Sequence, residues 1–318
     1  MTPEDICKGQ FFIYALRSAT EAAARAAFNW IGRGERGQGD QSARQAMFAE
    51  LAKLPISGKL IFGEGEGDMK TGSVIGIDSG GPVFDIAVDP IEGTSYMARG
   101  MTNAMAVMAL APEGTMFDPG PAFYMEKFVA PPGARGKIDP EQPIEGKLKV
   151  LGKVLNKPVS DLTVYVLEKP RHRELVERIH NAGARVALYP AGDVAGALMA
   201  AIPNSGIDAL AGTGGTREGI ISACAIRALG GEVFFRIDPQ LATEKAEVSK
   251  AGLSTTKWMA MDDIISSDEV YFCATGITTG LLVEGVERTD TFESTQTMMI
   301  AGPNGIRQLL TTFHPRTF

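Results

Sequence analysis

Strand-like and helix-like segments alternate along the second half of the chain, and this alternation constrains its fold more than any other feature. The residue pattern predicts helices at residues 173–182, 194–202 and 218–229 and from 238 to about 250. The predicted strands that alternate with them span residues 162–167, 185–189, 206–210, 231–237 and 269–274. Repeated strand–helix units are typical of a mostly parallel sheet covered by helices. We therefore expect an α/β fold for this half.

The first half is less regular and predicts an α+β arrangement. We expect helices at residues 3–31, 40–54 and 145–156, with Asp40 either as the cap of the second helix or as a loop acid that faces a site. Predicted strands lie at residues 58–62, 84–89 and 103–111 and within 117–129, residues 69–82 form a hairpin or loop, and short antiparallel strands follow in residues 282–314. The expected domains are an N-terminal α+β metal-binding domain, residues 1–150, and a C-terminal α/β substrate-binding domain with antiparallel tail strands, residues 151–318.

Composition excludes several classes of protein. The 318 residues carry a net charge of −7, which argues against non-specific binding to nucleic acid. Three cysteines lie far apart, at Cys7, Cys224 and Cys273, and this usage is typical of free thiols in a reducing compartment. Neither a secretory segment nor an apolar run of membrane-spanning length is visible. We expect a soluble, cytoplasmic protein.

The stretch from residue 84 to residue 94 contains the most informative acids. Apolar residues alternate with polar or small ones over 84–89, which predicts a strand, and Pro90 is expected to end its ladder because it has no N–H to donate. Asp89 and Glu92 can then converge on one point. Carboxylates held together repel unless a cation lies between them, and hard oxygen ligands suit Mg²⁺ or Mn²⁺. A plain turn with surface acids is the alternative.

Further polar groups follow the next predicted strands at the end where ligands bind in open α/β sheets. In chain order they are Lys169, Arg171 and His172, then Gly192 and Asp193, then Gly214, Gly215, Thr216, Arg217 and Glu218. Carboxylates from several loops beside basic groups indicate metal-assisted phosphate chemistry. The glycine turn that opens a helix offers N–H groups to an anion, and Lys169 and Arg171 offer positive charge. Thr94 is a candidate to orient the attacking water, and a plain turn threonine is the alternative.

Bland interpretations remain open for several of these positions. His172 can be a packing residue at a helix start, Tyr124 a core residue and Arg171 a surface ion pair. The run 63–68 alternates glycine with acids and is either a backbone brought close to a ligand or a solvated loop. Its acids would repel a pyrophosphate, so we discount a dinucleotide loop, and a nicotinamide-dependent dehydrogenase is only a remote fourth hypothesis.

Taken together, these residues resemble the class II fructose-1,6-bisphosphatase family, within the lithium-sensitive phosphatase superfamily. The matching segments span residues 30–34, 61–66, 85–94, 123–127, 169–172, 192–195, 214–219 and 274–278. They run in family order from about residue 25 to residue 290. The resemblance implies a layered αβαβα sugar-phosphatase-like fold. It also implies hydrolysis of the 1-phosphate of fructose 1,6-bisphosphate, which serves gluconeogenesis or Calvin-cycle carbohydrate metabolism.

The resemblance further implies two or more Mn²⁺ or Mg²⁺ ions, inhibition by lithium, a homo-oligomer (dimer or tetramer), and no nucleic-acid or membrane partner. Some relatives also take sedoheptulose 1,7-bisphosphate. The implied metal ligands are Asp40, Glu64, Asp89, Glu92 and Glu218. The implied catalytic residues are Thr94, Glu64 and Asp89. The implied substrate-binding residues are Arg36, Glu92, Gly93, Thr94, Tyr124, Lys169, Pro170, Arg171, Ala191, Gly192, Asp193 and Gly215.

This chain departs from the family pattern at three positions. Ala191 replaces an aspartate, Arg217 replaces a proline, and Arg36 replaces a lysine. Losing the carboxylate at position 191 removes an acceptor for a substrate hydroxyl, which costs about 1 kcal/mol. We hypothesise weaker binding of fructose bisphosphate or a shifted substrate preference. The alternatives are another lithium-sensitive phosphatase, acting on inositol phosphates or phosphonucleotides, and a weakly active sugar-phosphate-binding regulatory protein.

Overall fold

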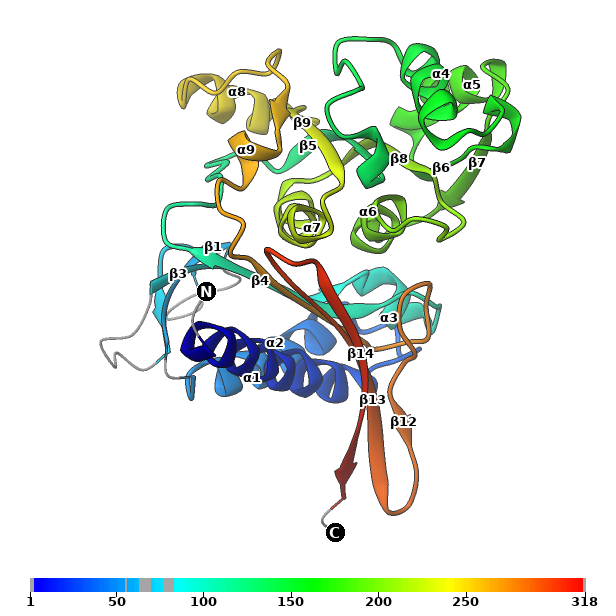
Figure 1. Cartoon of the computed structure of the whole chain (residues 1–318). Helices are drawn as coiled ribbons and strands as arrows, with labels where there is room; N and C mark the ends of the chain where they lie inside the picture. The colour runs from blue at the N-terminus through cyan, green and yellow to red at the C-terminus, as the bar shows by residue number, and fades with distance from the viewer. Residues whose placement is uncertain (1–2, 55, 63–69, 77–82, 317–318) are drawn as a thin grey trace. The chain divides into compact units, whose positions relative to one another are not determined.

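The computed structural model describes residues 3–54, 56–62, 70–76 and 83–316 (Figure 1). The chain divides into two compact units, residues 1–116 together with 267–318, and residues 117–266. Each unit has its own mixed sheet with helices beside it, so the α/β fold class is confirmed. No helix in the described ranges is both long and apolar enough to span a membrane.

The unit boundaries differ from the expected division at residue 150. Residues 124–130 form a strand that pairs within the second sheet, so the chain enters the second unit well before residue 150. The C-terminal strands pair with a strand at residues 105–112 and so return to the first unit. Hydrophobic patterns identify strands but not the sheet that each strand joins, which is why order along the chain misplaced this boundary.

The first unit has an eight-stranded sheet in its described residues, in the order β12-β13-β11-β4-β3-β1-β2, with β14 paired to β13 (Figure 1). Its strands are β1 (Ser57–Phe62), β2 (Val74–Ile75), β3 (Val83–Glu92), β4 (Met105–Pro112), β11 (Tyr271–Gly276), β12 (Glu287–Arg288), β13 (Phe292–Ala301) and β14 (Ile306–Pro315). Its helices are α1 (Pro3–Phe28), α2 (Arg36–Leu51) and α3 (Thr94–Arg99). The tail strands β13 and β14 have ten residues each rather than being short as predicted.

Register across this sheet decides which face carries the acids of β3. Val88, Met108 and Cys273 are direct partners across the antiparallel strands β3, β4 and β11, so their side chains share one face. The thiol of Cys273 lies 3.6 Å from the backbone oxygen of Ile13, which places α1 on that face. Because side chains alternate along a strand, Asp89 lies on the opposite face of the sheet.

The second unit has a six-stranded sheet in the order β10-β9-β5-β8-β6-β7. Its strands are β5 (Tyr124–Ala130), β6 (Thr163–Leu167), β7 (Arg185–Tyr189), β8 (Ala209–Gly215), β9 (Glu232–Ile237) and β10 (Met259–Ala260). Strands β7, β6, β8 and β9 of this described sheet run in one direction, but β5 lies between β8 and β9 and runs antiparallel to both, and β10 runs antiparallel to β9. The sheet is therefore mixed rather than mostly parallel, although the four strands that it takes from the alternating region run in one direction. The antiparallel strand β5 comes from before that region, and β11 joins the other sheet.

Helices cover both faces of the second sheet (Figure 1). They are α4 (Ile144–Leu155), α5 (Arg173–Asn181), α6 (Asp193–Ala201), α7 (Thr216–Leu229), α8 (Ala242–Lys250) and α9 (Met261–Ile264), with short 3₁₀ turns η2 (Pro132–Ala134), η3 (Val159–Asp161) and η4 (Pro170–His172). Phe128 of β5 packs in a buried cluster with Leu148 of α4 and Ile179 of α5. Its neighbour Lys127 lies on the other face, where a Cβ built on Gly219 of α7 would be 3.1 Å from Lys127 Cε.

Candidate active site

Strand β3 continues past Pro90 to Glu92, so Pro90 does not end the strand as expected. Asp89 pairs with Val107 and Glu92 with Met105, which means that a step of three residues on β3 faces a step of two on β4. This is a β-bulge, and a proline fits there because the ladder is already interrupted. Residues three apart on a regular strand point to opposite faces. The extra residue of the bulge restores a common face for Asp89 and Glu92.

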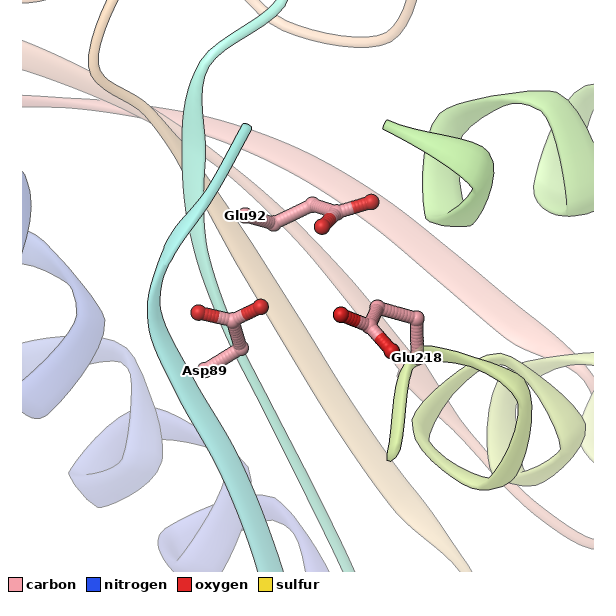
Figure 2. Close-up of side chains that lie close together, drawn as sticks. All are labelled: Asp89, Glu92 and Glu218. Carbon is pink, nitrogen blue, oxygen red and sulfur yellow. The ribbon is translucent and has the colours of Figure 1, made fainter. Parts of the chain in front are cut away.

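The carboxylates of Asp89 and Glu92 offer ligand oxygens that lie within 4.8 Å of one another (Figure 2). Both residues are buried, with 7% and 4% of their surface exposed. Asp89 Oδ1 also accepts the backbone N–H of Ile91 at 3.1 Å, which fixes the orientation of the carboxylate. Two carboxylates this close repel one another, and a bound cation removes that cost.

Gly93 and Thr94 form the turn that follows these acids. Gly93 has φ +82°, and a Cβ at this position would lie 2.7 Å from the ring of Tyr96. Thr94 is the first residue of α3, and its hydroxyl donates to the backbone oxygen of Ile91 at 3.0 Å. That bond uses the proton of the hydroxyl and leaves its oxygen lone pairs available as acceptors.

Asp85 lies on the same face of β3 as Asp89, but its carboxylate holds a neighbouring backbone segment in place. Its Oδ2 accepts the backbone N–H groups of Thr115 and Met116, both at 3.1 Å, and so ties down the segment after β4. Burial raises the pKa of Asp85, and these hydrogen bonds oppose that rise. The carboxylate is thus occupied by backbone donors.

Two predicted residues of the first unit lie on α2. The helix begins at Arg36, with Glu35 as its N-cap residue, so the prediction that Asp40 caps it is wrong. The helix starts four residues before Asp40, because residues 36–39 adopt helical geometry despite the two glycines among them. Asp40 lies in the second turn and forms an ion pair with Arg44 at 3.4 Å, and Arg36 is exposed. Glu64 and the acidic glycine run 63–68 lie outside the described residues.

The second unit gathers basic groups at the ends of β6 and β8. Lys169 Nζ donates to the backbone oxygen of Pro190 at 2.6 Å. Arg171 donates from Nε and Nη2 to the backbone oxygen of Thr213, at 3.1 and 2.7 Å, and its guanidinium lies 5.2 Å from the ring centroid of Tyr124. Within the described ranges neither cation forms an ion pair with a carboxylate, so their positive charges remain available to an anion.

His172 connects the two strands beside these basic groups. Its Nε2 accepts the backbone N–H of Thr213 at 2.8 Å, so the proton of the neutral ring sits on Nδ1, which donates to Leu167 at 2.6 Å. Burial lowers the pKa of His172, and the neighbouring charge of Arg171 acts in the same direction. The ring therefore links β6 to β8 in its neutral form, which is the packing interpretation left open by the sequence.

Sequence reasoning missed Lys127, which forms a buried ion pair with Asp193. Lys127 Nζ lies 2.6 Å from Asp193 Oδ2, and their side chains are 2% and 6% exposed. A Cβ on Gly214 would lie 1.8 Å from that carboxylate oxygen, so only glycine fits there. The available signal was a lysine between Met125 and Phe128 in strand β5, because an unpaired lysine is rarely buried.

Two turns place the remaining predicted residues at helix starts. Gly192, with φ +74°, precedes α6 and orients Asp193 as its first residue, while Tyr165 donates to the Gly192 carbonyl at 2.5 Å. Gly215 is the N-cap of α7, and a Cβ there would lie 1.9 Å from Glu218 Oε2. The carboxylate of Glu218 on α7 therefore folds over the start of its own helix, where negative charge is favoured (Figure 2).

Comparison with known proteins adds an independent line of evidence. Residues 11–314 match the model of the family described as bacterial fructose-1,6-bisphosphatase, glpX-encoded. The chain belongs to this family. The class 2 fructose-1,6-bisphosphatase of Haemophilus influenzae is 38% identical over 311 residues, covering 93% of both chains. The fructose-1,6-bisphosphatase 1 class 2 of Escherichia coli K12 is also 38% identical over 311 residues, covering 93% of this chain and 92% of that one. A solved structure, an extragenic suppressor from Pyrococcus furiosus, aligns with 59% of this chain and 69% of that chain at 14% identity and a TM-score of 0.32.

The donor set of this bisphosphatase family member suits a hard divalent cation. Asp89 and Glu92 offer carboxylate oxygens only, as Mg²⁺ and Mn²⁺ prefer. Asp89 keeps one oxygen on a backbone N–H, which is the kind of supporting bond that orients metal ligands. The buried carboxylate pair is thus compatible with a metal-dependent phosphatase.

Proposed function

We propose that this protein is a class II fructose-1,6-bisphosphatase, which converts fructose 1,6-bisphosphate and water to fructose 6-phosphate and phosphate. The observation that carries the proposal is the pair of buried carboxylates, Asp89 and Glu92, which the bulge of β3 turns to one face. The match of residues 11–314 to the family model supports the same function.

The proposed cations are Mn²⁺ or Mg²⁺, two or more in each site. Asp89 and Glu92 would hold them together with Glu218, Asp40 and Glu64. When bound, such cations lower the pKa of a water molecule and neutralise charge on the phosphoryl group. The orientation of Asp89 by the N–H of Ile91 and of Glu218 by the start of α7 supports their assignment as ligands.

Thr94 is the proposed residue that orients the attacking water. Its hydroxyl proton is held by the Ile91 carbonyl, so its oxygen is directed as an acceptor toward a water proton. Gly93 would let the substrate approach the backbone, because it carries no side chain in this tight turn. Asp89 and Glu64 remain the proposed catalytic carboxylates.

Lys169 and Arg171 are the proposed contacts to a phosphate group of the substrate. Both are anchored on backbone carbonyls, which fixes their positions without neutralising their charge. Tyr124 and Asp193 are expected to contact the sugar beside them. The other proposed substrate contacts are Arg36, Glu92, Pro170, Ala191, Gly192 and Gly215.

Phosphate release from a panel of substrates tests the proposal. The panel contains fructose 1,6-bisphosphate, sedoheptulose 1,7-bisphosphate, inositol 1-phosphate and a phosphonucleotide, each with Mn²⁺ or Mg²⁺ and with added Li⁺. We expect metal-dependent, lithium-sensitive release from fructose 1,6-bisphosphate. Turnover of inositol phosphate alone would contradict it. Binding of sugar bisphosphate without turnover would favour the second candidate, a regulatory protein, which Ala191 and Arg217 motivate.

We also propose a cytoplasmic homo-oligomer. Three large apolar side chains of β14 are strongly exposed, namely Ile306 at 50%, Leu309 at 56% and Phe313 at 63%. Leu309 and Phe313 share one face of β14, and Ile306 lies on the other. Exposed apolar groups on a strand at the edge of a sheet are typical of a surface that meets another chain. Light scattering coupled to size exclusion tests this, and a monomer at micromolar concentration would contradict it.

A further inference from the structure

A cavity of about 270 Å³ lies in the second unit, among residues to which the proposed catalytic reaction gives no role. Its walls come from β5, β9, α5, the start of α4 and the segment after α8. Phe128 lines it, and Phe128 packs on the face of the sheet covered by α4 and α5. The ion pair of Lys127 and Asp193 lies on the other face.

Lys147 is the unusual residue of this cavity. It lines the wall from the first turns of α4, yet only 5% of its surface is exposed. Its ammonium lies 4.4 Å from the ring centroid of Trp258 and 5.3 Å from that of Phe128. In the part of the chain that the structure describes, Nζ has no hydrogen-bond acceptor and no carboxylate partner. Aromatic faces attract its charge but do not replace the oxygen acceptors that three N–H donors require.

The other cations of the cavity each have a carboxylate of their own. Arg178 donates from Nε and Nη2 to Glu145, at 2.9 and 2.8 Å. Arg236 forms an ion pair with Glu126. Lys147 is therefore the cation left without an oxygen partner, and burial lowers its pKa accordingly.

Two positive charges, those of Lys147 and Arg236, lie close to the ring of Trp258. The guanidinium carbon of Arg236 lies 4.5 Å from the centroid of Trp258, the ring that Lys147 also contacts. The charge of Arg236 acts with burial to lower the pKa of Lys147, and an anion within reach of both cations would offset their repulsion. Residues 140–144 also line the cavity and lead into α4, so the positive end of the helix attracts an anion, while the carboxylate of Glu141 in the same segment opposes it.

We propose that this cavity binds a small oxyanion, a phosphate or carboxylate group, with Lys147 as its principal donor. Arg236 and Arg178 keep N–H groups beyond those used in their ion pairs and would complete the contacts. The volume lies below the usual range of about 300–1,000 Å³ for drug-sized ligands, so the ligand has few atoms besides the anionic group. The proposal does not rest on the phosphatase activity.

Fluorescence of Trp258 tests this directly. The chain has two tryptophans, so Trp30→Phe leaves Trp258 as the single reporter beside Lys147. Metal-free W30F is titrated with inorganic phosphate and, separately, with malonate, against sodium chloride of equal ionic strength. We expect a saturable change with at least one of the two anions, and the tighter one identifies the class. A change that merely follows ionic strength, or none with either anion, overturns the proposal.

Lys147→Met in the W30F background removes the charge and keeps the apolar stem. We expect its dissociation constant to rise about tenfold or more, as loss of a charge-assisted bond predicts. Lys149→Met is the matched control, since Lys149 is exposed on the same helix, and should bind as W30F does. Equal binding by K147M overturns the proposal.

A second measurement needs no variant at position 147. Amine labelling of the unmutated protein, read by mass spectrometry, should be slowed at Lys147 by the saturating anion and unchanged at Lys149. Equal labelling of Lys147 with and without the anion overturns the proposal.

Discussion

Lys127→Met should destabilise the second unit strongly, because it leaves the carboxylate of Asp193 buried without its partner. The two side chains are 2% and 6% exposed and the ion pair spans 2.6 Å, so water cannot replace the lost ammonium without opening the structure. Removing one partner of such a buried pair costs roughly 3–5 kcal/mol in free energy of unfolding. The double variant Lys127→Met/Asp193→Asn should recover a large part of this loss, because the uncompensated charge is gone.

Urea unfolding measures this prediction, followed by circular dichroism and by tryptophan fluorescence, since Trp258 reports on the second unit. The wild type, both single variants and the double variant complete a thermodynamic cycle. Lys149→Met, which alters an exposed lysine on α4, should remain within about 0.5 kcal/mol of the wild type. If Lys127→Met also stayed within that margin, the pair would not be desolvated and the reasoning would fail.

Three further predictions concern the candidate site. Thr94→Ala should lower kcat far more than it changes KM for fructose 1,6-bisphosphate, because orienting water matters mainly in the transition state. Thr94→Ser keeps the hydroxyl and should keep most of the activity. A rise in KM with kcat unchanged would remove Thr94 from the mechanism. Ala191→Asp should raise kcat/KM about fivefold for a sugar bisphosphate, because it restores a hydrogen-bond acceptor worth about 1 kcal/mol. No gain for any sugar bisphosphate would refute this. His172 has a folded-state pKa below its ordinary 6.5, so the unfolded chain takes up the proton first as pH falls. Stability from His172 is therefore present above pH 6.5 and lost below it, and the urea midpoint of His172→Gln should depend less on pH there; identical pH profiles would contradict this assignment.

Local patterns in this sequence were enough to predict many of its helices and strands. Helical spacing predicted a first helix at 3–31, close to the observed α1, Pro3–Phe28. Hydrophobic patterns also predicted most helices and strands of the second unit to within a few residues. These elements have strong periodicity, and periodicity is a local property of the chain.

What failed depends on pairing between distant segments. Pro90 should end a strand by local rules, but the bulge against β4 allows β3 to continue, and that bulge brings Glu92 onto the face of Asp89. Whether β5 runs parallel or antiparallel to its neighbours is likewise absent from its hydrophobic pattern. Lys127 received no role from the sequence, because its partner Asp193 is 66 residues away.

The candidate site could be predicted as residue types and not as geometry. The acids of β3 and the basic residues after β6 stood out because both follow strands at their carboxyl ends. The neutral tautomer of His172 and the anchoring of Arg171 on the Thr213 carbonyl required the fold. Sharing of cations between Glu218 and the acids of β3 remains a prediction.

Mn²⁺ binding measured together with phosphate release tests that central prediction most directly. Electron paramagnetic resonance counts the bound Mn²⁺ in the wild type, in Asp89→Ala and in Glu218→Ala, and each protein is then assayed with fructose 1,6-bisphosphate. The account predicts that each variant binds fewer ions than the wild type and releases no measurable phosphate. A Glu218→Ala protein that kept the full complement of Mn²⁺ and wild-type turnover would contradict it.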